Sequence, residues 1–274
     1  MTAALSAAAV SPERRLVVLD IDGTVILEDE SMSPGVVDAV REAEDAGHEV
    51  MLATGRSWEG TEEILRALGL SPEFVVCSNG AVTLRADGDG EYERFHIETF
   101  DPADVLRLLS EHLPDAKYMV ELADGHRLYT EHLGDWNLAN ATQVPFADLG
   151  AVPVCRIVVV SPGDTEGDFV ELVERIGLNE VSYAVGWTAW LDIAPQGVDK
   201  GTALERVRAA LGIHPAHVLV MGDGRNDIGM FEWARRGGGR AVAMAQGPSE
   251  VRDAAGEVTG SVQDGGVAAV LNAL

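Results

Sequence analysis

Residues 15–24 read Arg-Leu-Val-Val-Leu-Asp-Ile-Asp-Gly-Thr, a short apolar run that ends in two carboxylates. Such an uninterrupted apolar run is typical of a strand that is buried on both faces in the middle of a parallel sheet. Asp20 and Asp22 stand two positions apart where the strand gives way to a loop, so both side chains can face one cleft. Gly23 allows the backbone to turn tightly directly after them. The stretch predicts a central strand with a polar site at its carboxyl end, and a solvated acidic strand end is the alternative interpretation.

The segments that follow this strand alternate between helical and extended patterns. Ser33–Gly47 is expected to be a helix, with Ser33 as its N-cap, Pro34 at the first helical position and Gly47 at its end. Next come an expected strand over Glu49–Ala53, a helix from about Ser57 to Leu68 that ends at Gly69, and a strand over Phe74–Cys77. This strand–helix–strand–helix–strand order predicts an α/β fold, a doubly wound parallel sheet with helices on its faces.

The alternating pattern stops near Ala81 and resumes after residue 190. The intervening segment combines turn clusters such as Asp87–Gly90, an expected strand at Cys155–Val160 and an expected helix at Phe169–Ile176. After it come expected helices at Lys200–Leu211, Asn226–Arg235 and Val267–Leu274, and strands at His217–Met221 and Ala241–Met244. We therefore expect a core domain made of residues 14–81 and 191–274, an inserted α+β cap domain over residues 82–190, and a disordered tail over residues 1–13.

The composition limits the partners and the location. The 274 residues carry a formal net charge of −25, and such a surface repels nucleic-acid phosphates and anionic membranes, so neither is expected as a partner. The Ala-rich stretch Met1–Val10 has no Lys or Arg before its apolar part, and we interpret it as a frayed tail rather than a signal peptide. Cys77 and Cys155 have no neighbour at metal-ligand spacing, so we expect two buried free thiols and a cytoplasmic location.

Polar clusters follow two more of the expected strands. Thr54-Gly55-Arg56 comes after the second strand, and Ser78-Asn79-Gly80 comes after the third. Hydroxyl and backbone N–H groups in such positions can hold phosphoryl oxygens, although a helix N-cap and a turn are the alternative interpretations. Ligands of open α/β sheets bind at the carboxyl ends of the strands, so we expect these clusters to lie near Asp20.

A lysine and an acidic turn complete the set of polar clusters. Only Lys117 and Lys200 are lysines among the 20 basic residues, and Lys200 stands at the start of an expected helix, where its charge opposes the helix dipole. We expect it to neutralise a phosphoryl group and to hold the Asp20 carboxylate. The turn at residues 222–227, Gly-Asp-Gly-Arg-Asn-Asp, offers the hard oxygen ligands that suit Mg²⁺, with Asp223 as the expected direct ligand and Asp227 as a direct or supporting one.

These clusters together indicate phosphoryl transfer. Asp20 can attack phosphorus and form a mixed anhydride, while Asp22 can protonate the leaving oxygen and then deprotonate the attacking water. Mg²⁺ and Lys200 would supply the local positive charge that an anionic substrate needs on an anionic protein.

The chain also resembles a known family, the haloacid dehalogenase superfamily, and in particular its Cof-like phosphatase branch. The resemblance runs from about Arg15 onward: residues 20–24 are similar to the first family motif, residues 54–56 to the second, Lys200 to the third and residues 222–227 to the fourth. It implies a Rossmann-like core and a large α/β cap inserted after the second motif. The family's acid at the position of Asp22 is absent from the dehalogenase and ATPase branches, which are therefore disfavoured.

The resemblance also implies roles for individual residues. Asp20 would be the nucleophile and Asp22 the general acid and base. The phosphate or substrate would be bound by Thr54, Gly55, Asn79 and Lys200. Mg²⁺ would be bound by Asp20, Asp223 and the backbone carbonyl of Asp22, with Asp227 as a direct or supporting ligand and Gly23, Thr24, Arg56 and Asn226 in support. The branch usually has Gly-Asn where this chain has Ala245-Gln246, so a loop near the metal site is expected to differ.

The expected substrate is a small phosphorylated metabolite, with sugar phosphates as the leading class. A phosphomutase that uses the same two aspartates and a non-catalytic metabolite-binding protein are the alternatives, because fold does not imply function. Side chains of the cap would select the substrate, and His126, Arg127, His132, Trp136, Trp187 and Trp190 are candidates that are more often structural. The sequence leaves the oligomeric state open.

Overall fold

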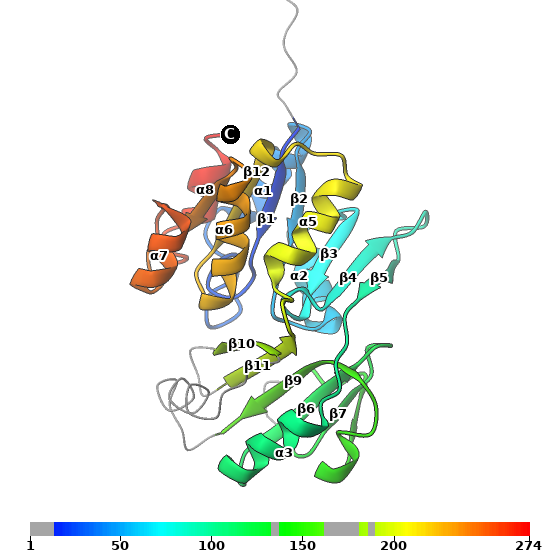
Figure 1. Ribbon diagram of the computed structural model, residues 1–274. Coiled ribbons are helices and arrows are strands. Elements are labelled where there is room, and N and C mark those ends of the chain that lie inside the picture. Colours follow the sequence, from blue (N-terminus) through cyan, green and yellow to red (C-terminus); the bar gives the residue numbers. More distant parts are fainter. Residues whose placement is uncertain (1–13, 133–136, 162–180, 186–189) are drawn as a thin grey trace, which may run out of the picture.

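A five-stranded parallel sheet forms the centre of the protein. The computed structural model describes residues 14–132, 137–161, 181–185 and 190–274 (Figure 1). The strand order is β14 (Glu257–Val258), β13 (Arg240–Ala243), β12 (Val218–Gly222), β1 (Leu16–Leu19) and β2 (Glu49–Leu52). As predicted, β1 lies inside the sheet, with Leu16–Leu19 fully buried between β12 and β2.

Helices cover both faces of this sheet, which confirms the doubly wound architecture. Alternate residues of β1 face opposite sides, so Val17 and Leu19 belong to one apolar cluster while Leu16 and Val18 belong to the other. The first cluster includes residues of α1 (Val36–Asp45), α2 (Trp58–Leu68) and α8 (Gly266–Leu271). The second includes residues of α5 (Lys200–Ala210), α6 (Ile228–Arg236) and α7 (Ser249–Ala255).

The predicted ends of α2 are confirmed, whereas the predicted start of α1 is wrong. Ser57 and Gly69 flank α2 as predicted, and Gly69 has the left-handed conformation, with φ 74°. The prediction for α1 was wrong at its start: the helix begins at Val36 after Gly35, which has φ 74°, so neither Ser33 nor Pro34 fills the predicted position. The Ser33 hydroxyl instead donates a hydrogen bond to the carbonyl of Val262 at 2.7 Å.

A three-stranded antiparallel sheet continues from the edge of the central sheet. β3 (Phe74–Cys77) touches it through a parallel bridge between Ala53 and Val76, and then pairs with β4 (Val82–Ala86), which pairs with β5 (Tyr92–Ile97). Two short elements, α7 and β14, were not predicted; β14 has only two residues, too few for a visible pattern.

The inserted segment forms a separate six-stranded sheet. Its order is β10 (Val181–Val185), β11 (Trp190–Pro195), β9 (Val154–Val160), β6 (Lys117–Leu122), β7 (Arg127–Tyr129) and β8 (Ala141–Gln143). Helix α3 (Ala103–His112) packs on it through Leu106 and Leu109. The division at residues 82 and 190 stays a prediction; the strand pairing joins β4 and β5 to β3, and joins β11 to the inserted sheet. The helix expected at Phe169–Ile176 lies outside the described residues.

The carboxyl ends of the central strands face the inserted sheet (Figure 1). Asp20 follows β1, Thr54 comes shortly after β2, Ser78 follows β3 and Asp223 follows β12. The fold therefore gathers the predicted polar clusters at the one edge of the central sheet that faces the inserted sheet. Within the described part of the chain, none of the helices is long and apolar enough to cross a membrane.

Candidate active site

A buried lysine joins two of the predicted aspartates. The Nζ of Lys200 donates to Oδ1 of Asp20 at 2.6 Å and to Oδ1 of Asp227 at 2.7 Å. Lys200 is the first residue of α5, and its side chain is completely buried. Burial alone would lower the pKa of Lys200, but the two carboxylates raise it above its ordinary value. Lys200 is therefore charged, and it holds the carboxylate of Asp20 from one side.

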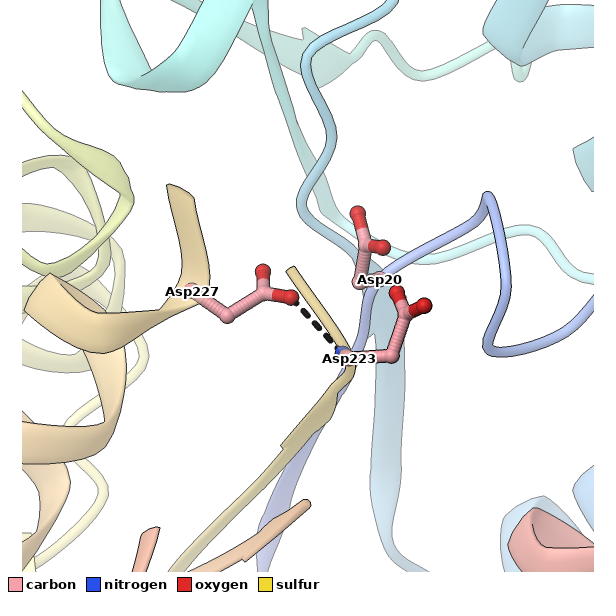
Figure 2. Close-up of side chains that lie close together, drawn as sticks. All are labelled: Asp20, Asp223 and Asp227. Carbon is pink, nitrogen blue, oxygen red and sulfur yellow. Dashed lines mark hydrogen bonds between the residues drawn. The ribbon is translucent and has the colours of Figure 1, made fainter. Parts of the chain in front are cut away.

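Three aspartates meet beside this lysine. Asp20, Asp223 and Asp227 can each offer one oxygen, and these oxygens lie within 4.8 Å of one another. Figure 2 shows Asp20 and Asp223 at the ends of neighbouring strands, while Asp227 reaches toward them from the opposite side. Oδ2 of Asp227 accepts hydrogen bonds from the backbone N–H groups of Asp223 and Gly224, both at 2.9 Å. Because both oxygens of Asp227 have protein partners, its carboxylate fixes the turn that carries Asp223.

The cluster has an excess of negative charge. Burial, and then the nearby Asp227, raise the pKa of Asp20 well above its ordinary value. Burial and Asp227 also raise the pKa of Asp223 to about 7. Three buried carboxylates with one lysine form a donor set that a divalent cation would stabilise, and carboxylate oxygens are the ligands that Mg²⁺ prefers. The residues therefore fit the Mg²⁺ that the sequence predicted.

Asp22 lies apart from these three carboxylates. Its side chain is 59% exposed and pairs with Arg56, whose Nη2 donates to Oδ1 at 2.6 Å and whose Nε donates to Oδ2 at 3.0 Å. Arg56 also contacts Oε1 of Glu30 at 3.3 Å. The carboxylate of Asp22 is therefore open to solvent and oriented by a guanidinium, while Asp20 is buried. The two aspartates, two residues apart, stand in different environments.

Gly23 and Thr24 complete the loop after β1. Gly23 has φ 70°, and a Cβ at this position would lie 2.2 Å from Oδ2 of Asp223, so only glycine fits. Thr24 is fully buried, and its hydroxyl has no hydrogen-bond partner among the residues that the structure describes. The loop thus packs directly against the acidic cluster.

Thr54, Gly55 and Asn79, which are predicted to bind phosphate, lie next to the acidic cluster. The hydroxyl of buried Thr54 accepts a hydrogen bond from the backbone N–H of Arg56 at 3.1 Å. A Cβ on Gly55 would lie 3.2 Å from the amide of Asn79, which shows how closely these two segments pack. Oδ1 of Asn79 accepts from Nδ2 of Asn226 at 3.0 Å, so Asn79 connects the second strand's loop to the acidic turn.

Charged residues of the inserted sheet contact Gly55 and Asn79. The sequence analysis did not identify these charged residues. Arg156 of β9 donates to the carbonyl of Gly55 and, at 3.2 Å, to Oδ2 of Asp192 on β11. Oδ2 of Asp192 also accepts from Nδ2 of Asn79 at 3.0 Å. Glu121 of β6, fully buried, accepts from Arg94 at 2.8 Å and from Ser78 at 2.7 Å. In the sequence, a charged residue within an otherwise apolar strand is the feature that could have identified them.

The cap candidates divide into three groups. Arg127 is buried and contacts the start of α2, where its Nη1 donates to the Ser57 hydroxyl at 3.3 Å. His126 is bonded within its own sheet to Asn140 and Thr142, and His132 is exposed. Trp190 is half-buried on β11, whereas Trp136 and Trp187 lie outside the described residues. Cys77 and Cys155 are buried free thiols, as predicted.

Comparisons with known proteins identify the family of the chain. The profile of a family described as haloacid dehalogenase-like hydrolase matches residues 17–271. The 5-amino-6-(5-phospho-D-ribitylamino)uracil phosphatase of Bacillus subtilis is 26% identical over 267 residues, covering 93% of this chain and 96% of that protein. The phosphoglycolate phosphatase of Methanosarcina acetivorans is 28% identical over 258 residues, covering 93% and 95%.

A solved structure shows the same fold. A haloacid dehalogenase-like hydrolase from B. subtilis superimposes with a TM-score of 0.78 at 21% identity, covering 95% of this chain and 99% of that chain. The family profile spans nearly the whole chain, including both segments of the core and the inserted sheet. The chain therefore belongs to the haloacid dehalogenase-like hydrolases, the family that its sequence resembled.

Proposed function

We propose that this hydrolase is a Mg²⁺-dependent phosphatase that removes the phosphoryl group of small phosphorylated metabolites through an aspartyl-phosphate on Asp20. One observation carries the proposal: Asp20 is held by Lys200 at 2.6 Å and lies beside Asp223 and Asp227, at the edge of the sheet that faces the inserted domain. This arrangement combines a positioned nucleophile with a site for a cation, which is what phosphoryl transfer requires.

The first step uses the contrast between Asp20 and Asp22. A carboxylate oxygen of Asp20 attacks phosphorus and the bond from phosphorus to the ester oxygen breaks. Asp22, which for this step must be protonated and released from its pair with Arg56, gives its proton to that oxygen. Lys200 holds the attacking carboxylate, and Thr54 and Gly55 are the residues that we propose to bind phosphoryl oxygens. Asp20 and Asp223 would hold Mg²⁺, and the bound ion would supply positive charge next to the phosphoryl oxygens.

The second step releases phosphate. Asp22, now ionised, takes a proton from water, and the water oxygen attacks the phosphorus of the aspartyl-phosphate. The bond from phosphorus to the Asp20 oxygen breaks, so that the Asp20 carboxylate is regenerated and inorganic phosphate is released. The exposure of Asp22 gives it access to water, and its pair with Arg56 orients the carboxylate. The two relatives are named as phosphatases, which favours a phosphatase over a mutase.

Small phosphate esters, and sugar or sugar-alcohol phosphates in particular, are the proposed substrates. The names of the two relatives specify a phosphorylated ribityl group and phosphoglycolate, both small phosphate monoesters. The net charge of −25 disfavours nucleic acids as substrates. Lys200 and the cation would therefore supply the positive charge that binds a phosphate. Two buried thiols fit a reducing, cytoplasmic location.

A panel of phosphate esters tests the proposal. The purified protein is incubated with ribitol phosphate, hexose phosphates, phosphoglycolate and p-nitrophenyl phosphate, with Mg²⁺ or with a chelator, and phosphate release is measured. We expect steady release that needs Mg²⁺ and disappears in Asp20→Asn. Transfer of the phosphoryl group within a sugar, with no net phosphate release, would instead identify a mutase, and no turnover of any ester by folded, Mg²⁺-bound protein would favour a binding protein.

A further inference from the structure

Gln246 connects three separate segments of the acidic site. It belongs to the Ala245-Gln246 pair that departs from the branch pattern. Its Nε2 donates to the carbonyl of Gly23 at 2.5 Å and to Oδ2 of Asp223 at 3.3 Å, and its Oε1 accepts from the N–H of Val262 at 3.1 Å. An amide has two N–H donors and one carbonyl acceptor, so the side chain uses both kinds of group at once.

The backbone on either side of Gln246 is held in place. Nη1 of Arg252 donates to the carbonyls of Ala245 at 3.1 Å and Gly247 at 2.8 Å. A Cβ on Gly247 would lie 2.8 Å from the backbone oxygen of Asp223, so the segment approaches Asp223 closely and glycine is required there. The loop is therefore fixed, and it positions the amide of Gln246 beside the acidic cluster.

The amide restricts the position of the Asp223 carboxylate. This carboxylate is 3% exposed and lies near Asp20 and Asp227. A donor on Oδ2 fixes the rotation of the carboxylate, and Oδ1 takes no part in this contact. The same amide holds the Gly23 carbonyl, and Gly23 follows directly after Asp22.

We propose that Gln246 is a positioning residue for the metal site, which fixes the Asp223 carboxylate and the loop of Asp22 and Gly23 relative to each other. The inference rests on the proposed function, because it takes the acidic cluster to be the Mg²⁺ site. Partners that orient a ligand in this way change metal affinity strongly although they do not touch the metal. The extra methylene of Gln over Asn provides the reach to both acceptors from the position of residue 246.

Metal binding without substrate tests this role. Isothermal titration calorimetry gives the Mg²⁺ dissociation constant of the parent and of Gln246→Ala, Gln246→Asn and Gln246→Glu. We expect Gln246→Ala to weaken Mg²⁺ binding by roughly 10- to 100-fold, the range seen when such partners are removed. Gln246→Asn should also bind Mg²⁺ more weakly than the parent, and Gln246→Glu, which replaces the donor by a carboxylate of equal length, should weaken it as well.

Ser33→Ala is the matched control. Ser33 donates to the carbonyl of Val262, so its removal loosens the segment that Gln246 contacts without touching Asp223. The control should keep the parent's Mg²⁺ affinity, and thermal unfolding should show that all proteins compared are folded. If Gln246→Ala does not fold, the isosteric Gln246→Glu provides the comparison.

Two results would overturn the inference: a folded Gln246 variant with the parent's Mg²⁺ affinity, or an equal loss of affinity in Ser33→Ala. Phosphate release by the parent is measured separately. A parent that binds Mg²⁺ but releases no phosphate from any ester would refute the proposed phosphatase, and the comparison of affinities would still decide the role of Gln246.

Discussion

The ammonium group of Lys200 lies between the carboxylates of Asp20 and Asp227, 2.6 Å from one and 2.7 Å from the other, and all three side chains are buried. Lys200 thus separates two like charges that would otherwise repel each other at short range. The pair formed with Asp20 also fixes the carboxylate that is proposed to attack phosphorus. This relationship links the stability of the core to the proposed chemistry.

Replacing Lys200 by Met should destabilise the Mg²⁺-free protein strongly. Removing one partner of a buried ion pair leaves an uncompensated charge, which costs about 3–5 kcal/mol. Arg66→Met is the control, because it breaks an exposed ion pair with Glu62, worth at most about 1 kcal/mol. Urea unfolding measures both free energies of unfolding. Equal effects of the two substitutions would contradict a central role for Lys200.

Gly23→Ala should abolish Mg²⁺ binding, because its Cβ would collide with Oδ2 of Asp223. Gly69→Ala provides a matched comparison: Gly69 has φ 74° against 70° for Gly23, but a Cβ there meets nothing within 4 Å. Both substitutions carry the backbone strain of about 1–2 kcal/mol. Only Gly23→Ala should lose the metal, which calorimetry would show; retention of the parent's Mg²⁺ affinity in that variant would argue against the close packing of Gly23 on Asp223.

Asp22→Asn should slow the first step in a way that depends on the leaving group. Loss of a general acid lowers the rate for an alkyl phosphate such as ribitol phosphate by about 10²- to 10⁴-fold, while p-nitrophenolate leaves without a proton. Rapid-quench measurement of the first turnover with each ester gives the two rates. Glu30→Gln, which removes the other carboxylate near Arg56, should keep both rates. An equal loss with both esters would show that Asp22 is not the acid.

Much of the core could be predicted because its strands are apolar runs that are followed directly by polar residues. The apolar runs at Leu16–Leu19 and Val218–Gly222 end directly before Asp20 and Asp223, and parallel strands bring such ends to one edge. That Lys200 would hold Asp20 was also predicted, and the structure places the two in contact.

The contacts between the core and the inserted sheet could not be predicted. Glu121, Arg156 and Asp192 stand in apolar strands, and their partners Ser78, Gly55 and Asn79 are far away in the sequence. No local pattern specifies which buried charges will meet. The reach of Gln246 was also invisible, because it depends on the path of the loop that carries it.

Glu121→Gln should test how much the buried contacts between the two sheets stabilise the protein. Glu121 is fully buried and pairs with Arg94 and Arg156, so its neutralisation removes the negative charge that faces both guanidinium groups, while Arg156 keeps its pair with Asp192. We expect a loss of about 3–5 kcal/mol of unfolding free energy. Glu73→Gln, which weakens the exposed pair with Arg85, should change it by at most about 1 kcal/mol. A similar, small change in both would contradict the importance of the buried pairs.

The most direct test of the account is the detection of a phosphoryl group on Asp20. Asp22→Asn is mixed with Mg²⁺ and a ³²P-labelled phosphate ester of a nitrophenol, quenched in acid, and digested. The account predicts label on the peptide that contains Asp20, release of that label by hydroxylamine, and no label when Asp20 is also replaced by Asn. Continued release of phosphate by the parent, with no label on either protein, would show that water attacks the ester directly and would contradict the aspartyl-phosphate.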